Sequence, residues 1–196
     1  MPQNLKDHST ANRVLDAAQV LVKARGWSAV SYADLAERVG IRTASIHHHF
    51  PGKAELGRAL VTRYNSTFQS ELADIDKRSD GPVQRLRGYL TLLRAALADG
   101  GSLCLCTMLA ADYEMLPAPM KDLVTKFNDI NVEWLAGVLR DGAAAGRFVS
   151  VDDPITEAQV IFSEAQGAQL LARCYRDAAR YDLVTDSLVA RLTAPR

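Results

Sequence analysis

Apolar side chains recur every three or four residues between positions 56 and 75, which is the spacing of one face of an α-helix. Similar spacing returns over residues 86–97, 120–138 and 155–175, and no segment alternates apolar and polar residues as a strand does. The sequence therefore predicts an all-α fold of about nine helices, with short helices near the N-terminus and mostly longer ones after them. The first of these stripes consists of Leu56, Leu60, Tyr64, Phe68, Leu72 and Ile75.

Chain length and composition indicate a globular protein. The 196 residues are 48% hydrophobic, which is enough to build one sizeable core. No apolar run approaches the roughly 18–20 residues of a membrane span, and the opening residues lack the apolar centre of a signal peptide. Three cysteines, an odd number, do not suit a disulfide scaffold. We expect a soluble, cytoplasmic protein that makes no contact with a membrane.

The formal net charge is zero, but the charges are unevenly distributed. Residues 1–53 carry seven Lys or Arg against four Asp or Glu, and the rest of the chain carries a matching excess of acidic residues. All four histidines also lie in residues 1–53. A basic end on a slightly acidic body is typical of a protein that contacts phosphate groups at one end only.

Residues 31–56, SYADLAERVGIRTASIHHHFPGKAEL, have the pattern of a helix-turn-helix. Ser31 is predicted to begin a short helix, with Asp34 at the capping-box position, and Gly40 is predicted to end it in the left-handed conformation. Thr43 is the predicted N-cap of a very short third helix, which ends near Phe50 before the break at Pro51-Gly52. This short helix points small or polar side chains outward, which lets its backbone approach the bases of DNA.

The same segment resembles the DNA-binding domain of the TetR family of bacterial regulators, closely over about 50 residues. In that family a helix opened by Thr or Ser carries an Ile-Ala or Leu-Ala pair and ends in Val-Gly-Val or Val-Gly-Ile. A small-residue helix follows, and then a run of the form Leu-Tyr-x-His/Tyr-Phe-x-x-Lys-x-x-Leu. The corresponding residues here are Ser31, Leu35-Ala36, Val39-Gly40-Ile41 and the run from Ile46 to Leu56, with His47 in place of the usual Tyr.

This resemblance implies which residues face DNA. Arg42, Thr43 and Ala44 are expected against base edges, with Arg42 the first candidate because arginine is the commonest reader of guanine. The three histidines are expected on bases or phosphates, and Ser31 and Lys53 on the DNA backbone. The full expected set is Ser31, Arg42, Thr43, Ala44, His47, His48, His49 and Lys53. A plain solvated face and a metal site are the alternatives for the histidine run, although neighbouring helix positions point about 100° apart, so one ion cannot easily bind all three.

The resemblance also implies a division into a DNA-binding domain, residues 1–53, and an effector-binding and dimerisation domain, residues 54–196. The expected protein is a homodimeric repressor that binds a palindromic double-stranded DNA operator, is released by a small-molecule effector, and needs neither cofactor nor metal. The last two helices are expected to pair with the same two helices of a second copy of the chain in a four-helix interface. The alternative is that they close the core of a monomer.

Effector contacts are expected from side chains of the C-terminal domain, although an aromatic stripe at helical spacing is equally typical of a core. The candidates are Cys104, Met108, Tyr113, Met115, Phe127, Trp134, Phe162 and Glu164. Glu164 is either a handle for a ligand or an exposed helix position. Cys104 and Cys106 are either packing residues or a redox or electrophile sensor; on a helix, residues two apart point in nearly opposite directions, which disfavours a disulfide between them.

The alternative of another functional class is a helical enzyme or small-molecule carrier with a helix-turn-helix-like end. The sequence contains no Ser/His/acid set, Gly-rich phosphate loop or Cys/His metal spacing. Because every histidine lies in residues 1–53, the rest of the chain lacks the most usual general base. The sequence therefore predicts a regulator and not an enzyme.

Overall fold

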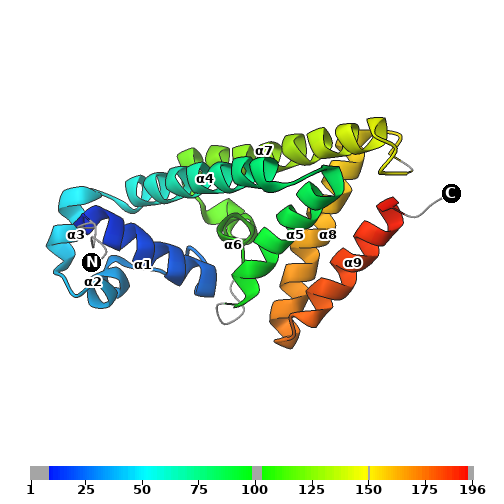
Figure 1. Ribbon diagram of the computed structural model, residues 1–196. Coiled ribbons are helices and arrows are strands. Elements are labelled where there is room, and N and C mark those ends of the chain that lie inside the picture. Colours follow the sequence, from blue (N-terminus) through cyan, green and yellow to red (C-terminus); the bar gives the residue numbers. More distant parts are fainter. Residues whose placement is uncertain (1–8, 99–102, 150, 194–196) are drawn as a thin grey trace, which may run out of the picture.

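The computed structural model describes residues 9–98, 103–149 and 151–193, and these residues form nine α-helices and one 3₁₀ helix without any strand (Figure 1). The all-α prediction is confirmed. The elements are α1 Thr10–Arg25, α2 Tyr32–Val39, α3 Thr43–His49, α4 Lys53–Arg78, α5 Pro82–Ala98, α6 Leu105–Ala111, η1 Tyr113–Met115, α7 Ala118–Ala144, α8 Pro154–Tyr175 and α9 Ala179–Thr193.

Helices α1, α2 and α3 pack on one another and form a head at one end of the molecule (Figure 1). The Ser9 hydroxyl accepts a hydrogen bond from the backbone N–H of Asn12 and caps α1. Gly26 ends α1 at a φ of +86°, a backbone conformation that favours glycine. The buried faces of the three helices share one apolar core, to which Val14, Leu35 and Ile46 each contribute a fully buried side chain.

The start of α3 differs from the prediction by one residue. Arg42 is the N-cap, with extended backbone angles, and Thr43 is the first helical residue and makes no capping bond. The reason is the tightness of the preceding turn, in which Gly40 and Ile41 both donate to the carbonyl of Ala36. The turn is then complete at Ile41, and the chain can begin the next helix directly after Arg42.

The body is built around α4, which runs from the head along α7 (Figure 1). Of the predicted stripe on α4, Leu56, Leu60, Phe68 and Leu72 are buried, and the other two residues are half-buried. Helix α7 packs in turn on α8, and α8 on α9 at the far end of the molecule.

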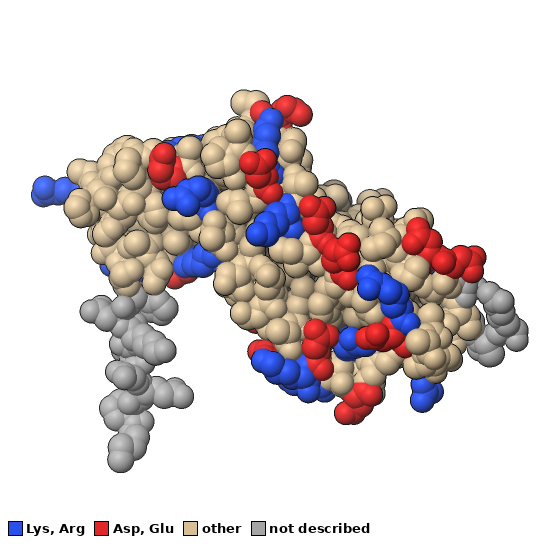
Figure 2. Space-filling view, turned by 90° about the horizontal axis from the view of Figure 1, so that it is seen from above, with Lys and Arg blue, Asp and Glu red and all other residues tan. Residues whose placement is uncertain are grey.

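Basic and acidic side chains are interleaved over the face of the body shown in Figure 2, where many of them lie next to a side chain of opposite sign. Within the described residues, none of the helices combines the length and the apolar character needed to span a bilayer.

Candidate nucleic-acid interface and effector cavity

A reciprocal capping box fixes the first helix of the helix-turn-helix. The Ser31 hydroxyl accepts from the N–H of Asp34 at 3.2 Å, and the Asp34 carboxylate accepts from the N–H of Ser31 at 2.8 Å. Arg25 at the end of α1 pairs with the same carboxylate at 2.8 Å. The hydrogen bonds from Ser31, followed by the contact with Arg25, lower the pKa of Asp34 to about 2. The sequence prediction of a capping box is confirmed, and the Ser31 hydroxyl is engaged in it.

The short helix α3 is anchored on one side and free on the other. Ile46 and Phe50 are buried in the head, while Arg42, Ala44 and the three histidines are exposed. Four of the expected DNA-contacting residues, Arg42, Ala44, His48 and His49, line one shallow groove. Thr10, Ile41 and Ser45 complete its wall, and the position of Thr10, at the start of α1, could be found only from the folded head.

His47 lies apart from this groove, beside the break that follows α3. Its Nδ1 is 3.3 Å from the carbonyl oxygen of Pro51, and its ring centroid is 4.6 Å from that of Tyr32. The Tyr32 hydroxyl donates to the carbonyl of Phe50 at 2.9 Å. The histidine run is therefore divided, with His48 and His49 lining the groove and His47 outside it. No three His, Cys, Asp or Glu side chains converge on a possible metal position anywhere in the described ranges.

Lys53, the first residue of α4, reaches back to the turn between α1 and α2. Its Nζ donates to the carbonyl of Trp27 at 3.0 Å and lies 4.8 Å from the centroid of the buried Trp27 ring. Partial burial lowers the pKa of Lys53 from its ordinary value. An ammonium group has three donors, so a phosphate contact by Lys53 is compatible with this bond. The structure thus gives Lys53 a role in positioning the head that its sequence position did not indicate.

Two side chains from the body hold the C-terminal end of α1. The Asp112 carboxylate, between α6 and η1, accepts from the N–H groups of Trp27 and Ser28 at 2.7 and 3.1 Å. Arg173 of α8 donates to the carbonyl oxygens of Ala24 at 2.6 Å and Lys23 at 3.5 Å. A cation at the C-terminal end of a helix also interacts favourably with the helix dipole. We call Asp112 and Arg173 the head clasp; neither residue carried a signal in the sequence.

The expected effector residues are dispersed over the body. Phe127 is buried in a cluster with Tyr64 and Phe68, and Trp134 stacks on Tyr89 and donates to Asp76 at 3.0 Å.

The remaining candidates occupy separate places. Tyr113 lies under the ammonium of Lys121, Met108 lies beside Arg173, and Phe162 is half-buried on α8. Met115 is 70% exposed. Glu164 pairs with Arg191 at 3.2 Å, which satisfies its carboxylate within the protein. Of the expected set, Cys104 lines the cavity described next, and Met108 lines a larger open hollow of about 960 Å³ beside α8.

A cavity of about 270 Å³ lies between the head and the body. Its walls come from four helices and the start of α6: Lys23 of α1, Tyr64 and Phe68 of α4, Leu93 of α5, Gln169 of α8, and Cys104. Because α1 belongs to the head, any occupant of this cavity touches both parts of the molecule. Its volume is close to the lower end of the range for small-molecule sites.

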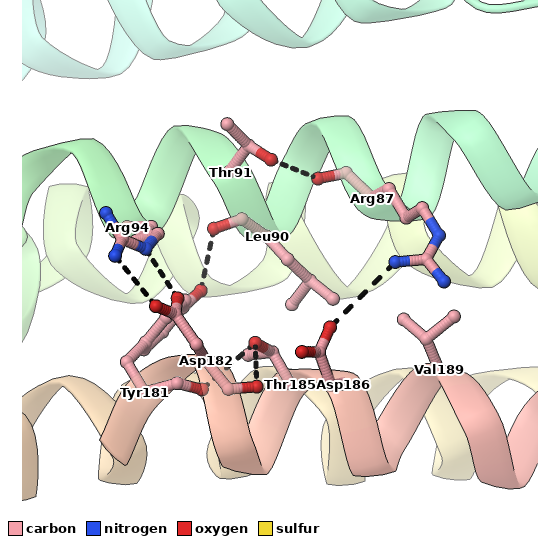
Figure 3. Close-up of a pocket in the computed structure, with 9 residues that line it drawn as sticks. All are labelled: Arg87, Leu90, Thr91, Arg94, Tyr181, Asp182, Thr185, Asp186 and Val189. Atoms are coloured by element: carbon pink, nitrogen blue, oxygen red, sulfur yellow. Dashed lines mark hydrogen bonds and ion pairs between the residues drawn. The ribbon is translucent and has the colours of Figure 1, made fainter. Parts of the chain in front are cut away.

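A second hollow, between α5 and α9, is occupied by the protein's own polar groups (Figure 3). Arg94 donates to the carboxylate of Asp182 at 2.7 Å, and the Tyr181 hydroxyl donates to the carbonyl of Leu90 at 2.8 Å. The hydrogen bonds from Arg94 lower the pKa of Asp182. These bonds tie α9 to α5 and leave the hollow a structural contact between the two helices.

The cysteines differ in their surroundings. Cys104 and Cys106 are both buried and unbridged, and the Cys104 sulfur lies 3.3 Å from the Tyr64 hydroxyl. Burial raises the pKa of the Cys106 thiol well above its ordinary value, which opposes formation of the reactive thiolate. The packing interpretation is therefore favoured for Cys106 in this conformation. Cys174, on α8, is exposed on this single chain.

Comparison with known proteins decides the family. Residues 14–60 match the family model described as bacterial regulatory proteins, tetR family. A solved transcriptional regulator of the TetR family from Agrobacterium tumefaciens is 34% identical, covers 94% of this chain and 97% of its own, and superposes with a TM-score of 0.90. The chain belongs to the TetR family.

Two further TetR relatives extend the likeness over most of the chain. A TetR transcriptional regulator from Legionella pneumophila is 29% identical over 93% of this chain and 97% of its own, with a TM-score of 0.85. The transcriptional repressor NemR of Escherichia coli strain K12 is 22% identical over 87% of each chain. The chain is a TetR-type transcriptional regulator whose N-terminal helix-turn-helix is the DNA-binding element, and the enzyme or carrier alternative is not favoured.

Proposed function

We propose that the protein is a repressor that binds a two-fold symmetric operator as a homodimer and leaves it when a small molecule occupies the body. The observation that carries this proposal is the groove on α3, where Arg42, His48 and His49 stand exposed around small side chains. Such a helix can enter the major groove with its backbone close to the base edges. His47 and Lys53, which lie beside the break after α3, would contact phosphates.

The homodimer is supported by apolar side chains that α8 and α9 leave exposed. Val160, Leu171 and Tyr175 of α8 and Leu183 of α9 are 39–73% exposed, which is unusual for large apolar residues on two neighbouring helices. Gly167 lies in the same stretch of α8, and a Cβ added there would meet no atom within 4 Å. A partner helix could therefore approach α8 closely. Two-fold pairing of these helices would place two heads on successive major grooves, about 34–36 Å apart.

The two predicted domains would have separate roles. Residues 1–53 would bind DNA, and residues 54–196 would dimerise and hold the effector, with the head clasp between them. Effector binding would favour a conformation whose heads no longer match the operator spacing, which shifts the population away from DNA. As a cytoplasmic regulator of this kind, the protein would have no catalytic role.

Substitution on the α3 groove tests the proposal. Binding to a duplex from the region upstream of its own gene is measured by fluorescence anisotropy for the unchanged protein and for Arg42→Ala. The loss of one bidentate base contact is expected to weaken specific binding by about 1–3 kcal/mol and to relax the preference at one base pair. Glu37→Ala, an exposed change on α2, is the matched control and should leave the preference unchanged. Equal behaviour of both variants would contradict the assignment of α3 as the base-reading helix.

The dimer is tested separately by sedimentation velocity. Leu171→Asp places a charge on the exposed apolar face of α8 and should yield monomers that bind the duplex weakly. Asp122→Ala, an exposed change on α7, is the control and should sediment as the unchanged protein does. A Leu171→Asp protein that remained fully dimeric would move the interface elsewhere.

A further inference from the structure

We propose that the cavity between α1, α4, α5 and α8 binds a small, neutral, largely apolar molecule that donates a hydrogen bond to Gln169 Oε1. This inference rests on the proposed function, because it identifies the chemical class of the effector. It also links the cavity to the head clasp.

The side chain of Gln169 is the central observation. It is completely buried on α8, and its Nε2 donates to the carbonyl oxygen of Leu93 at 2.5 Å. That bond fixes the orientation of the amide, since a carbonyl can only accept. No donor among the described residues lies within hydrogen-bond distance of Oε1. A buried acceptor without a partner is costly, and in native proteins nearly all such groups are paired with protein, water or ligand.

Gln169 lines the cavity, and because its Oε1 is shielded from solvent, a ligand's donor would reach this oxygen by drawing the side chain toward the cavity. Most of the surrounding wall is apolar, from Phe68 of α4 and from Leu92, Leu93 and Ala96 of α5. A ligand with an apolar body and one hydroxyl or N–H group would satisfy Oε1 and cover this wall at the same time. The volume of about 270 Å³ limits the occupant to a small molecule.

The charged groups around the cavity favour a neutral ligand. Lys23 of α1 and Glu71 of α4 both line it, and their opposite charges leave no net excess of either sign. Burial raises the pKa of Tyr64 well above its ordinary value, so the phenol that lines the cavity is uncharged at neutral pH. An ionised ligand would therefore meet a like charge as well as an opposite one, and part of its lost hydration would go uncompensated.

The same helix connects the ligand to DNA binding. Arg173, which holds the carbonyl of Ala24 at the end of α1, lies four residues after Gln169, one turn further along α8. Lys23, whose side chain lines the cavity, also offers its carbonyl to Arg173 at 3.5 Å. A ligand whose donor draws the Gln169 side chain into the cavity thus acts on α8 one helical turn away from Arg173, whose bond to the Ala24 carbonyl positions the head.

Matched pairs of probes test the chemistry on the full-length protein. The pairs are benzyl alcohol with benzyl methyl ether, indole with 1-methylindole, and benzamide with N,N-dimethylbenzamide, in which methylation removes every donor at nearly constant shape. Calorimetric titration is expected to show saturable binding of at least one donor-bearing probe. Its methylated partner should bind with an affinity at least about tenfold lower. If none of the donor-bearing probes binds, or if a probe and its methylated partner bind equally, the proposal is overturned.

Two variants locate the binding. Gln169→Met removes the acceptor at similar size and should abolish the difference between paired probes. Ala96→Leu fills the cavity from α5 while Gln169 itself is kept, and it should abolish probe binding while circular dichroism stays unchanged. Glu164→Gln, on α8 but outside this cavity, should bind as the unchanged protein does. Binding that persists in a folded Ala96→Leu protein would place the probes elsewhere.

Failure of this proposal is separable from failure of the proposed function. DNA binding without any probe is measured in parallel. Operator binding without probe discrimination would overturn only the ligand assignment, and a crystal structure with only an ordered water on Gln169 Oε1 would do the same. Discriminating probe binding by a protein that ignores DNA would overturn only the proposed function.

Discussion

The carboxylate of Asp112 accepts a hydrogen bond from the backbone N–H of Trp27 at 2.7 Å, although the two residues are 85 positions apart in the chain. Trp27 belongs to the turn that joins α1 to α2, and Asp112 belongs to the body. A Cβ at the neighbouring Gly26 would come within 2.9 Å of the same carboxylate. The body therefore fixes the position of the head through a close contact between a side chain and a turn, and not only through α4.

Removal of the Asp112 carboxylate should loosen the head. Asp112→Ala leaves the N–H groups of Trp27 and Ser28 without their acceptor. Where such a group stays shielded from water, the free energy of unfolding falls by about 1–3 kcal/mol. Chemical unfolding should show a lower free energy of unfolding, and operator affinity should fall with it. Asp129→Ala, an exposed change on α7, serves as the control and should alter neither quantity. Unchanged stability of Asp112→Ala would mean that water replaces the carboxylate at no cost.

The second part of the head clasp predicts a local effect. Arg173→Ala removes the donor to Ala24 and the cation at the end of α1, and each such helix-end interaction contributes about 0.3–1 kcal/mol. Hydrogen exchange should accelerate over the last turn of α1 and the turn after it, while α7 stays protected. Arg140→Ala, whose partner Glu133 is exposed, should change neither region. Equal protection of the end of α1 in all three proteins would exclude Arg173 as a link between body and head.

Lys53 is expected to act on DNA binding without selecting a sequence. Lys53→Met keeps much of the apolar stem over the Trp27 ring but removes the donor to the Trp27 carbonyl and the charge beside the DNA backbone. Binding should weaken to a similar extent for operator and for unrelated duplexes, and the salt dependence should become less steep. A loss confined to the operator would instead identify Lys53 as a base-contacting residue.

The capping box of α2 predicts a dependence of stability on pH. The pKa of Asp34 is about 2 in the folded protein, below its ordinary 3.8, mainly because Ser31 donates to the carboxylate. A lowered pKa in the folded state means that the stabilisation is complete above the ordinary value. It is lost as pH falls from about 3.8 to about 2. Acid unfolding of Asp34→Asn should show less decline across that window than the unchanged protein. An identical decline in both would assign the acid sensitivity to other carboxylates.

The sequence predicted the parts of this fold that depend on neighbours in the chain. The capping box of Ser31 and Asp34 and the left-handed Gly40 are set by residues within a few positions of each other. The buried stripe on α4 follows from the same helical period. The start of α3 differed from the prediction by one residue, because the preceding turn is already complete at Ile41.

Contacts between distant segments could not be predicted in this way. Asp112 and Arg173 meet the end of α1 across 85 and 149 residues, and nothing near either of them in the sequence indicates that contact. In the sequence, Gln169 is an ordinary polar residue among apolar ones, and only the structure shows that it is buried against α5. Residues chosen for the cavity by aromatic spacing, such as Phe127 and Trp134, pack against other aromatic rings instead.

A salt titration with two duplexes tests whether α3 reads a specific DNA sequence. Affinity of the purified protein is measured between 50 and 200 mM salt for the duplex upstream of its gene and for a shuffled duplex of the same composition. Affinity is expected to fall steeply with salt for both duplexes. Binding to the natural duplex is expected to be tighter at every salt concentration, and Arg42→Ala should reduce that difference. Binding that is independent of salt, or equal for both duplexes, would mean that α3 does not read this sequence.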